Sequence, residues 1–86
     1  MESVKLLISP DARRDFAALP VDIQLRFREI CGRLIDWPNV SGAKPMRYDW
    51  KGHFRIRTGD WRIIFRPAGQ EIWIVRIAHR RDVYED

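Results

Sequence analysis

The chain has 86 residues, 45% of them hydrophobic, and this length suits one compact domain but is too short for two. Sixteen lysine and arginine residues stand against twelve aspartate and glutamate residues, so the formal charge is +4 at pH 7. Cys31 is the single cysteine, which excludes an internal disulfide, and no apolar run reaches the roughly 18 residues that cross a bilayer. We therefore expect a cytoplasmic protein with no membrane segment, folded as one domain over residues 1–86.

The first third of the chain predicts a short strand followed by two helices. The segment Val4–Ile8 is apolar with a β-branched residue at each end, which is typical of a strand. Ser9 suits the N-cap of a helix and Pro10 its first position, and Leu19-Pro20 interrupts that helix because the residue before proline avoids helical geometry. The second helix is amphipathic, and the side chains at helical spacing that we expect to be buried are Ile23, Phe27, Ile30 and Leu34.

From Met46 onward the hydrophobic period changes to two, which predicts strands separated by turns. The expected strands are Met46–Tyr48, His53–Thr58, Trp61–Arg66 and Glu71–Ala78. A loop is expected over Asn39–Pro45, and turns at Asp49–Gly52, Gly59-Asp60 and Pro67–Gln70. Strands joined by tight turns pair antiparallel, so the order β-α-α-β-β-β-β predicts an α+β fold in which a helical hairpin packs on one face of a small, mainly antiparallel sheet.

The hairpin over His53–Arg66 carries arginines that folding does not explain. A two-residue type II′ turn at Gly59-Asp60 places Arg57 directly opposite Arg62, on the side of the hairpin away from the apolar residues. Like charges in this position destabilise a sheet. A solvated outer face is the plain alternative, but a bound polyanion would reverse the sign of the cost, because guanidinium groups bind phosphate oxygens bidentately. Arg66 lies far from the turn and is predicted to be a rim or solvent residue.

Other residues extend this cationic region. Eight lysine and arginine residues lie between Lys51 and Arg81 against only two acidic residues, which favours a nucleic acid or an acidic partner. His79 follows the last predicted strand and therefore lies beside the hairpin arginines. Four aromatic residues offer a stacking surface for an unpaired base, although packing in the core is the commoner role: Tyr48, Trp50, Phe54 and Trp61.

The residue types favour RNA cleavage without a metal or another cofactor. The sequence has no HExxH motif, no cysteine pair and no glycine-rich nucleotide loop, and Cys31 sits beside a core position of a helix, where a packing role is expected. Several arginines with one histidine and one tyrosine suit attack of a 2′-hydroxyl on the adjacent phosphorus. Arginines would stabilise the phosphorane, and histidine or tyrosine would move the protons.

The sequence resembles the RelE/ParE toxin superfamily, in its RelE-like branch, over nearly the whole chain. The matching segments are "KPMRYDWKGHFRIRTGDWRIIF" and the closing "IAHRRDVY". The resemblance implies the toxin of a type II toxin–antitoxin pair, an endoribonuclease that cleaves mRNA, typically in the ribosomal A site next to rRNA. It also implies a cognate antitoxin in a hetero-oligomeric complex. We expect an amphipathic helix or strand of the antitoxin to bind across the groove and to cover or displace the C-terminal residues.

The resemblance also implies the roles of individual residues. The expected catalytic residues are Arg57, Arg62, His79, Arg80 and Tyr84, and the expected substrate-binding residues are Lys51, Arg55 and Arg81. Arginine is a very poor proton donor, so His79 or Tyr84 would carry the protons, with the acid and the base left open between them. Two alternatives remain: a ParE-like inhibitor of DNA gyrase without RNA chemistry, and a noncatalytic RNA- or ribosome-binding module.

Overall fold

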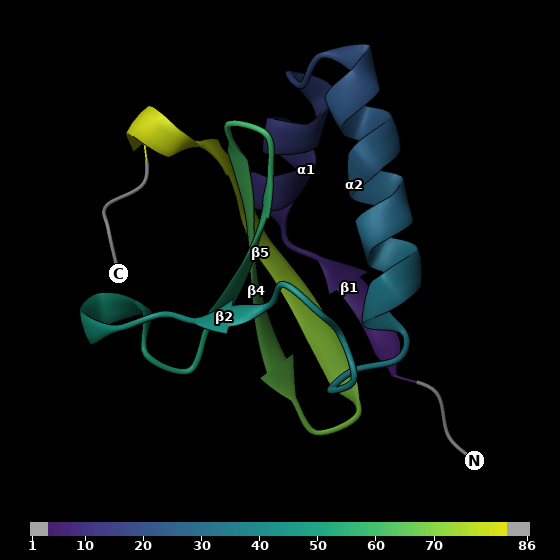
Figure 1. The fold of residues 1–86 in the computed structure, drawn as a ribbon, viewed down its shortest axis with the longest axis vertical. Helices are drawn as coiled ribbons and strands as arrows, with labels where there is room; N and C mark the ends of the chain where they lie inside the picture. Colours follow the sequence, from purple (N-terminus) through teal and green to yellow (C-terminus); the bar gives the residue numbers. More distant parts are fainter. Residues whose placement is uncertain (1–3, 83–86) are drawn as a thin grey trace.

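Two helices and a five-stranded sheet make up the computed structural model, which describes residues 4–82 (Figure 1). The helices are α1 (Pro10–Ala17) and α2 (Val21–Leu34), and the strands are β1 (Lys5–Ile8), β2 (Lys44–Pro45), β3 (Phe54–Thr58), β4 (Trp61–Ala68) and β5 (Glu71–His79). Two 3-10 turns follow β2 and β5, η1 (Tyr48–Trp50) and η2 (Arg80–Asp82). The sheet order is β1-β5-β4-β3-β2, with β1 and β5 parallel and the other pairs antiparallel, so the α+β prediction is confirmed.

Local signals in the sequence set the helix boundaries. The Ser9 hydroxyl accepts a hydrogen bond from the Ala12 amide at 3.1 Å, and Pro10 occupies the first helical position, so α1 begins where its cap predicts. Pro20 separates the helices and serves as the N-cap residue of α2. The predicted inner side of α2 is buried at all four positions, in one core with apolar residues of β3, β4 and β5. The helix therefore covers one face of the sheet.

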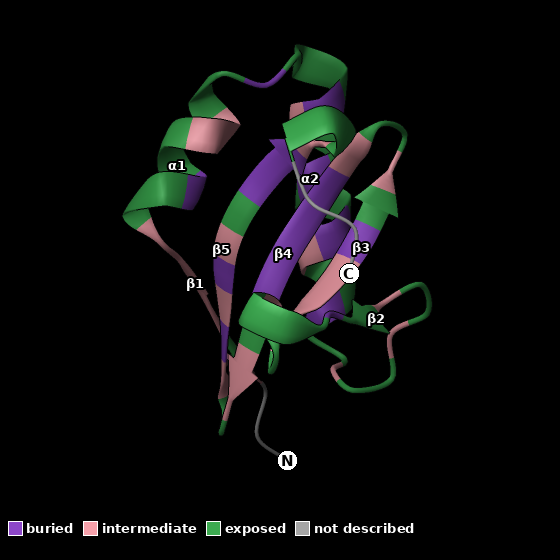
Figure 2. Cartoon of the chain, turned by 90° about the vertical axis from the view of Figure 1, so that its left-hand side faces the viewer, coloured by how far each residue is buried: buried purple, intermediate pink, exposed green. Residues whose placement is uncertain are grey.

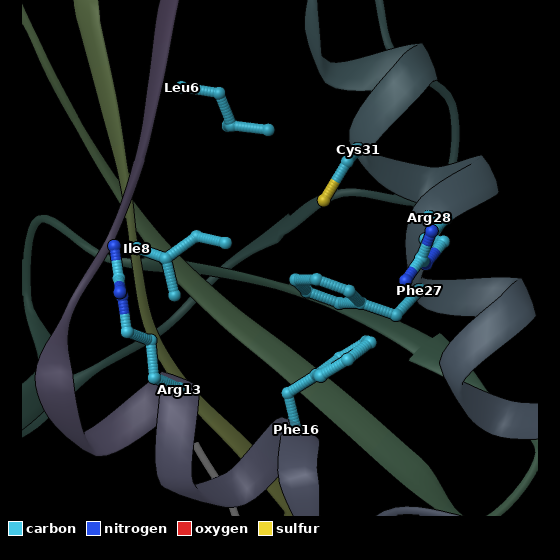
Figure 3. A pocket seen from close by; sticks show the side chains of 7 residues that line it. All are labelled: Leu6, Ile8, Arg13, Phe16, Phe27, Arg28 and Cys31. Carbon is cyan, nitrogen blue, oxygen red and sulfur yellow. The ribbon is translucent and has the colours of Figure 1, made fainter. Parts of the chain in front are cut away.

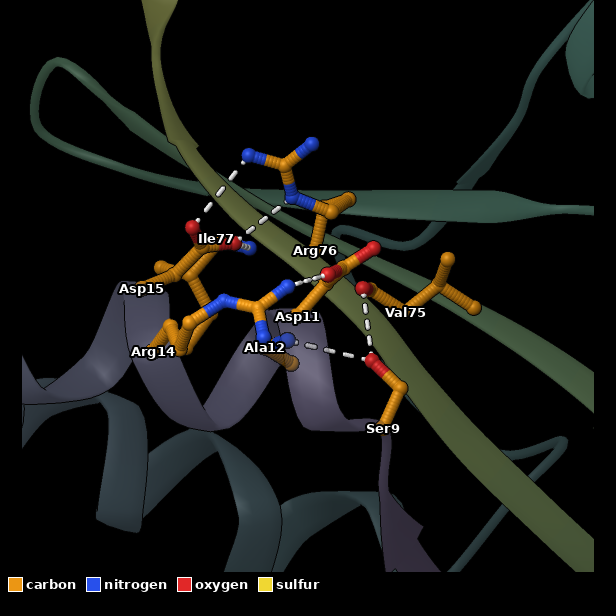
Figure 4. Close-up of polar contacts among 8 residues, drawn as sticks. All are labelled: Ser9, Asp11, Ala12, Arg14, Asp15, Val75, Arg76 and Ile77. Atoms are coloured by element: carbon orange, nitrogen blue, oxygen red, sulfur yellow. Dashed lines mark hydrogen bonds and ion pairs between the residues drawn. The ribbon is translucent and has the colours of Figure 1, made fainter.

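The helix α1 lies along the part of β5 that extends beyond its pairing with β1. The strand β1 pairs with β5 only as far as Ile74, and there the Ser9 amide donates to the Ile74 carbonyl at 3.0 Å. One residue further, the Ser9 hydroxyl donates to the Val75 carbonyl at 2.9 Å, and the Ile77 amide then donates to the Asp15 carboxylate at 2.8 Å (Figure 4). Side chains of α1 and its cap thus satisfy backbone groups of β5 that lie beyond its pairing with β1.

The same carboxylate holds Arg76. The Nε atom of Arg76 lies 2.8 Å from Asp15 Oδ2, and its Nη2 atom lies 3.2 Å from Oδ1, which is a bidentate pair. This hydrogen bonding raises the pKa of the Arg76 guanidinium above its ordinary value. Arg76 therefore has a structural role, although the sequence analysis included it among the eight basic residues of the cationic region.

Two predicted strands differ from the observed strands by more than one residue at an end. The strand expected at Met46–Tyr48 lies earlier, at Lys44–Pro45, where it pairs with the start of β3. Met46 is buried and its amide bonds to the His53 carbonyl at 2.9 Å, but Tyr48 then turns into the left-handed region with φ of 57°, which ends any extended run.

The turn expected at Pro67–Gln70 is shorter. β4 continues to Ala68, and only Gly69-Gln70 forms the turn, with φ of 61° at Gly69. Pro67 fits inside the strand because β3 accompanies β4 only as far as Phe65. Beyond that point no strand within residues 4–82 pairs with this side of β4, so a residue without an amide hydrogen is tolerated there.

Candidate RNA-binding and active site

The hairpin of β3 and β4 has the predicted register. Its turn is at Gly59-Asp60, and Gly59 has φ of 61° while Asp60 has a negative φ, as a type II′ turn requires. Arg57 pairs directly with Arg62 in this register. The apolar pairs Ile56–Ile63 and Phe54–Phe65 lie on the other side and pack in the core. The cross-strand arginine pair is therefore confirmed.

The two arginines of the pair differ in exposure. Arg57 is exposed on β3, whereas Arg62 is only 7% exposed. The plain alternative of a solvated outer face therefore does not hold at Arg62, which lies on the strand between β3 and β5 with Arg57 and Ala78 as its cross-strand neighbours. Figure 2 shows a continuous buried stretch in β4, which covers Arg62–Phe65. A guanidinium at such a position acts in a lower dielectric than water.

His79 lies beside the arginine hairpin, as predicted, and Arg80 follows it next to the hairpin turn. His79 pairs with Trp61 across β5 and β4, and the two rings meet edge to face with centroids 5.1 Å apart. The Nδ1 atom of His79 faces the Arg81 amide at 3.4 Å, so a neutral imidazole in this arrangement carries its proton on Nε2. The Arg80 amide donates to the Asp60 carbonyl at 2.7 Å, and its Nε atom lies 3.9 Å from the Asp60 carboxylate. η2 is therefore attached to the turn.

The remaining predicted site residues lie at different places. Arg55 is half-buried on β3, between Lys44 of β2 and Ile64 of β4. Arg81 is exposed in η2, and Lys51 is exposed before the start of β3, at the opposite end of that strand from Arg57. Tyr84 lies outside the described residues, so its expected place is untested.

A groove that the sequence did not reveal runs between α2 and β3. It has a volume of about 380 Å³, and its lining residues are Arg26, Glu29, Ile30, Arg33, Arg57 and Thr58. Arg33 is held in place by hydrogen bonds to the Ser41 carbonyl and hydroxyl. The signal in the sequence is the spacing of Arg26 and Arg33, which are seven residues apart and hence on one side of α2. Arg57 therefore lines the groove and also pairs with Arg62 across the hairpin.

A second concavity is apolar. It lies between β1, α1 and α2, has a volume of about 410 Å³, and is lined by Leu6, Ile8, Arg13, Phe16, Phe27, Arg28 and Cys31 (Figure 3). The Arg28 guanidinium carbon lies 5.8 Å from the centre of the Phe16 ring. Burial raises the pKa of the Cys31 thiol from 9.0 to about 11, so the thiol is neutral at pH 7 and suits the expected packing role.

Neither a metal centre nor a membrane segment is found in residues 4–82. No three histidine, cysteine, aspartate or glutamate side chains in this range gather in a way that would hold a metal ion. None of the helices in the same range is both long enough and apolar enough to cross a membrane.

Comparison with known proteins decides the family. The model of the ParE toxin family, the toxin of the parDE type II toxin–antitoxin system, matches residues 6–84. The chain belongs to this toxin family. Toxin RelG of Mycobacterium tuberculosis is 31% identical to this toxin over 75 residues, which are 85% of this chain and 86% of RelG.

Solved structures agree with the assignment. A chain of the toxin–antitoxin complex RelBE2 from Mycobacterium tuberculosis superposes with a TM-score of 0.79 at 30% identity, over 93% of this toxin and 94% of that chain. A chain of the RelB–RelE complex from Methanococcus jannaschii has a TM-score of 0.76 over 91% of this toxin and 94% of that chain; at 22% identity it shows the fold alone. The family match and the likeness to RelG and to RelBE2 assign the toxin to the RelE-like branch of the RelE/ParE superfamily, as the sequence resemblance predicted.

Proposed function

We propose that this toxin is a metal-independent endoribonuclease that cleaves mRNA in the ribosomal A site, in the cytoplasm, and that a cognate antitoxin holds it inactive. The observation that carries the proposal is the pairing of Arg57 with Arg62, next to the strand end that holds His79. Two cations that face each other across a sheet repel each other, and together they suit a bound phosphate. The likeness to RelG and to the RelBE2 complex supports a toxin that works with an antitoxin.

The cleavage step follows from the chemistry of a phosphodiester. The 2′-oxygen forms a bond to the adjacent phosphorus while the bond to the 5′-oxygen breaks, which leaves a 2′,3′-cyclic phosphate and a 5′-hydroxyl. The protein has to accept the proton of the 2′-hydroxyl, stabilise the anionic phosphorane and protonate the departing 5′-oxygen. Arg62 suits the second task, because a guanidinium that is 7% exposed is screened little by water.

The proton transfers fall to His79 and Tyr84 in this proposal. Histidine is the side chain that most readily exchanges protons near pH 7. The Arg81 amide faces Nδ1 of His79, which leaves Nε2 as the nitrogen to face the substrate, and the Trp61 ring supports the imidazole from one side. Arginine keeps its proton, so Arg57 and Arg80 are assigned to binding the phosphate and the transition state.

We propose the apolar pocket between β1, α1 and α2 as a docking place for one part of the antitoxin, in addition to the segment expected over the C-terminal residues. Its floor is apolar, while Arg13 and Arg28 lie in its lining, which suits an amphipathic segment with acidic residues on its polar side. The strand β1 is an edge of the sheet and pairs only with β5 among the described strands. Antitoxin binding should therefore shield Cys31 from alkylation, and Arg28→Glu should weaken the complex.

The proposed activity is tested with purified toxin and mRNA, with and without ribosomes, in buffer containing EDTA. Cleavage sites are mapped for the wild type, Arg62→Ala and Tyr84→Phe. Arg66→Gln serves as the matched charge control, because Arg66 is exposed on β4 and outside the proposed site. We expect EDTA-resistant cleavage by the wild type and by Arg66→Gln, and a loss of at least about 100-fold in the other two variants.

The outcome also separates the alternatives. If both site variants still inhibit growth while the wild type leaves ribosome-bound mRNA intact, the nuclease proposal is lost. If the toxin then inhibits the supercoiling of DNA that purified gyrase catalyses, the ParE-like alternative is supported and gyrase is the target. Binding to RNA or ribosomes without cleavage would instead favour the noncatalytic module.

A further inference from the structure

The loop between β2 and β3 presents one aromatic side chain to solvent in an unusual conformation. Tyr48 is 82% exposed and has φ of 57°, and it is the one non-glycine residue with a positive φ in residues 4–82. We propose that Tyr48 is a stacking platform for an unpaired nucleobase of the RNA. The inference rests on the proposed function and adds to it a subsite that binds a base, whereas the arginines bind phosphate.

Folding gives no reason for a tyrosine at this position. A residue with a Cβ is strained in the left-handed region, where glycine is free, and an aromatic side chain is a clear outlier there. The exposed ring of Tyr48 buries little surface that would offset the strain. Strained residues of this kind concentrate at functional sites, where the surrounding structure holds them in place.

The loop is built to hold that conformation. Successive backbone hydrogen bonds close it, from the Trp50 amide to the Arg47 carbonyl at 3.1 Å, from Lys51 to Tyr48 at 3.0 Å and from His53 to Trp50 at 2.9 Å. The rings of Trp50 and His53 pack edge to face with centroids 5.2 Å apart. Tyr48 is therefore presented from a tightly bonded turn, which lowers the entropy lost when a base stacks on it.

The other three candidates for base stacking already pack against rings within the protein. Trp61 packs against His79, Trp50 packs against His53, and Phe54 stacks with Phe65. Among the described residues, Tyr48 is the one aromatic side chain that is exposed. The structure therefore selects one of the four stacking candidates that the sequence left open.

The position of Tyr48 suits an RNA strand bound to the arginine face. Both 3-10 turns, η1 and η2, lie on the side of the sheet away from α2, at opposite ends of that side (Figures 1 and 2). η2 carries Arg80 and Arg81, and η1 begins with Tyr48. Arg47 and Lys51 are exposed on either side of η1 and suit the phosphates next to a stacked base. An RNA strand with one phosphate at Arg62 would thus reach the ring of Tyr48 further along its length.

The test uses a short single-stranded RNA with 2′-O-methyl groups, which block attack by the 2′-oxygen, and with 2-aminopurine at one position at a time. Stacking quenches 2-aminopurine fluorescence, so no cleavage is needed for the measurement. The RNA is titrated free in solution and as the message on purified ribosomes, with the wild type, Tyr48→Phe, Tyr48→Leu and Tyr48→Gly. Val21→Ala is the control, because Val21 is also an exposed apolar residue and lies at the start of α2.

We expect quenching at one RNA position with the wild type, Tyr48→Phe and Val21→Ala, and its loss with Tyr48→Leu and Tyr48→Gly, together with about tenfold weaker binding. Thermal unfolding separates this role from a structural one, because Tyr48→Gly should leave the unfolding midpoint unchanged or raise it as the strain is relieved.

The proposal would be overturned if quenching persists in Tyr48→Leu. It would also be overturned if the wild type quenches 2-aminopurine at none of the RNA positions. Weaker antitoxin binding by Tyr48→Leu with unchanged quenching would also overturn it and assign Tyr48 to a protein interface. If the wild type quenches but cleaves no mRNA under any condition, the stacking subsite stands and the nuclease proposal fails.

Discussion

Arg57 and Arg62 face each other directly across β3 and β4, the first exposed and the second almost completely buried. Cross-strand neighbours of like charge destabilise a sheet by roughly 0.2–1 kcal/mol relative to neutral neighbours. A guanidinium also loses favourable hydration when it leaves water, which adds to the cost at Arg62. The repulsion between the two guanidinium groups by itself disfavours the free toxin, and a phosphate bound between them would offset it.

Replacing Arg57 by glutamine should separate stability from activity. We expect Arg57→Gln to raise the free energy of unfolding by about 0.2–1 kcal/mol, because the cross-strand repulsion is removed. Cleavage of ribosome-bound mRNA should fall about tenfold or more, because a charged hydrogen bond to phosphate is lost. Urea unfolding and single-turnover cleavage measure the two effects. Arg66→Gln removes the same charge from an exposed position of β4, and an equal loss of cleavage in that variant would mean that only net charge matters.

Asp15 should contribute to stability and not to cleavage. Its carboxylate accepts the Ile77 amide and holds Arg76, so Asp15→Ala leaves a half-buried backbone amide without its partner and should cost about 1–3 kcal/mol of unfolding free energy. Arg76→Gln keeps the bond to Ile77 and should cost less than about 1 kcal/mol, because the Arg76 side chain is 45% exposed. Urea unfolding and hydrogen exchange at Ile77 measure both. A loss of cleavage per folded molecule in Arg76→Gln would contradict the structural assignment.

Cys31 should alkylate slowly in the folded toxin. Burial raises the pKa of its thiol from 9.0 to about 11, so below pH 9 the folded toxin has about a hundredth of the thiolate that the unfolded chain has. Between pH 9 and 11 the unfolded chain releases this proton first, so the contribution of Cys31 to stability is complete below pH 9 and is lost as pH rises toward 11. Iodoacetamide reaction rates from pH 7 to 10, with and without urea, measure the difference. Equal rates in both would show that the thiol is open to solvent.

Much of the fold follows from signals a few residues long. Ser9-Pro10 begins α1, Leu19-Pro20 separates the helices, and Gly59-Asp60 sets the hairpin register, because each depends on backbone geometry that its own residues favour. The prediction of a strand at Met46–Tyr48 is wrong because it too relied on local signals, and here the local signal was missing. A left-handed residue is usually signalled by glycine, and Tyr48 adopts that conformation without the signal.

Other features depend on contacts between distant segments. The bond from Ile77 to Asp15 joins residues that are 62 positions apart, and no local pattern indicates it. The burial of Arg62 requires the strand order, since alternation along β4 predicts only which side the residue is on and not what flanks it. The groove that combines Arg26 with Arg57 likewise exists only once α2 lies beside β3.

The salt dependence of RNA binding should identify which arginines touch phosphate. For a single strand, the logarithm of the binding constant falls with the logarithm of salt concentration by about 0.7 for each neutralised phosphate. Arg81 is exposed in η2, and Arg81→Gln should reduce the slope by about that amount if it contacts one phosphate. Arg14→Gln is the control, because Arg14 pairs with Asp11 on α1. Binding of 2′-O-methyl RNA at several KCl concentrations measures the slopes. If Arg14→Gln reduces the slope as much as Arg81→Gln, the RNA is attracted by the net charge of +4 and not by a defined site.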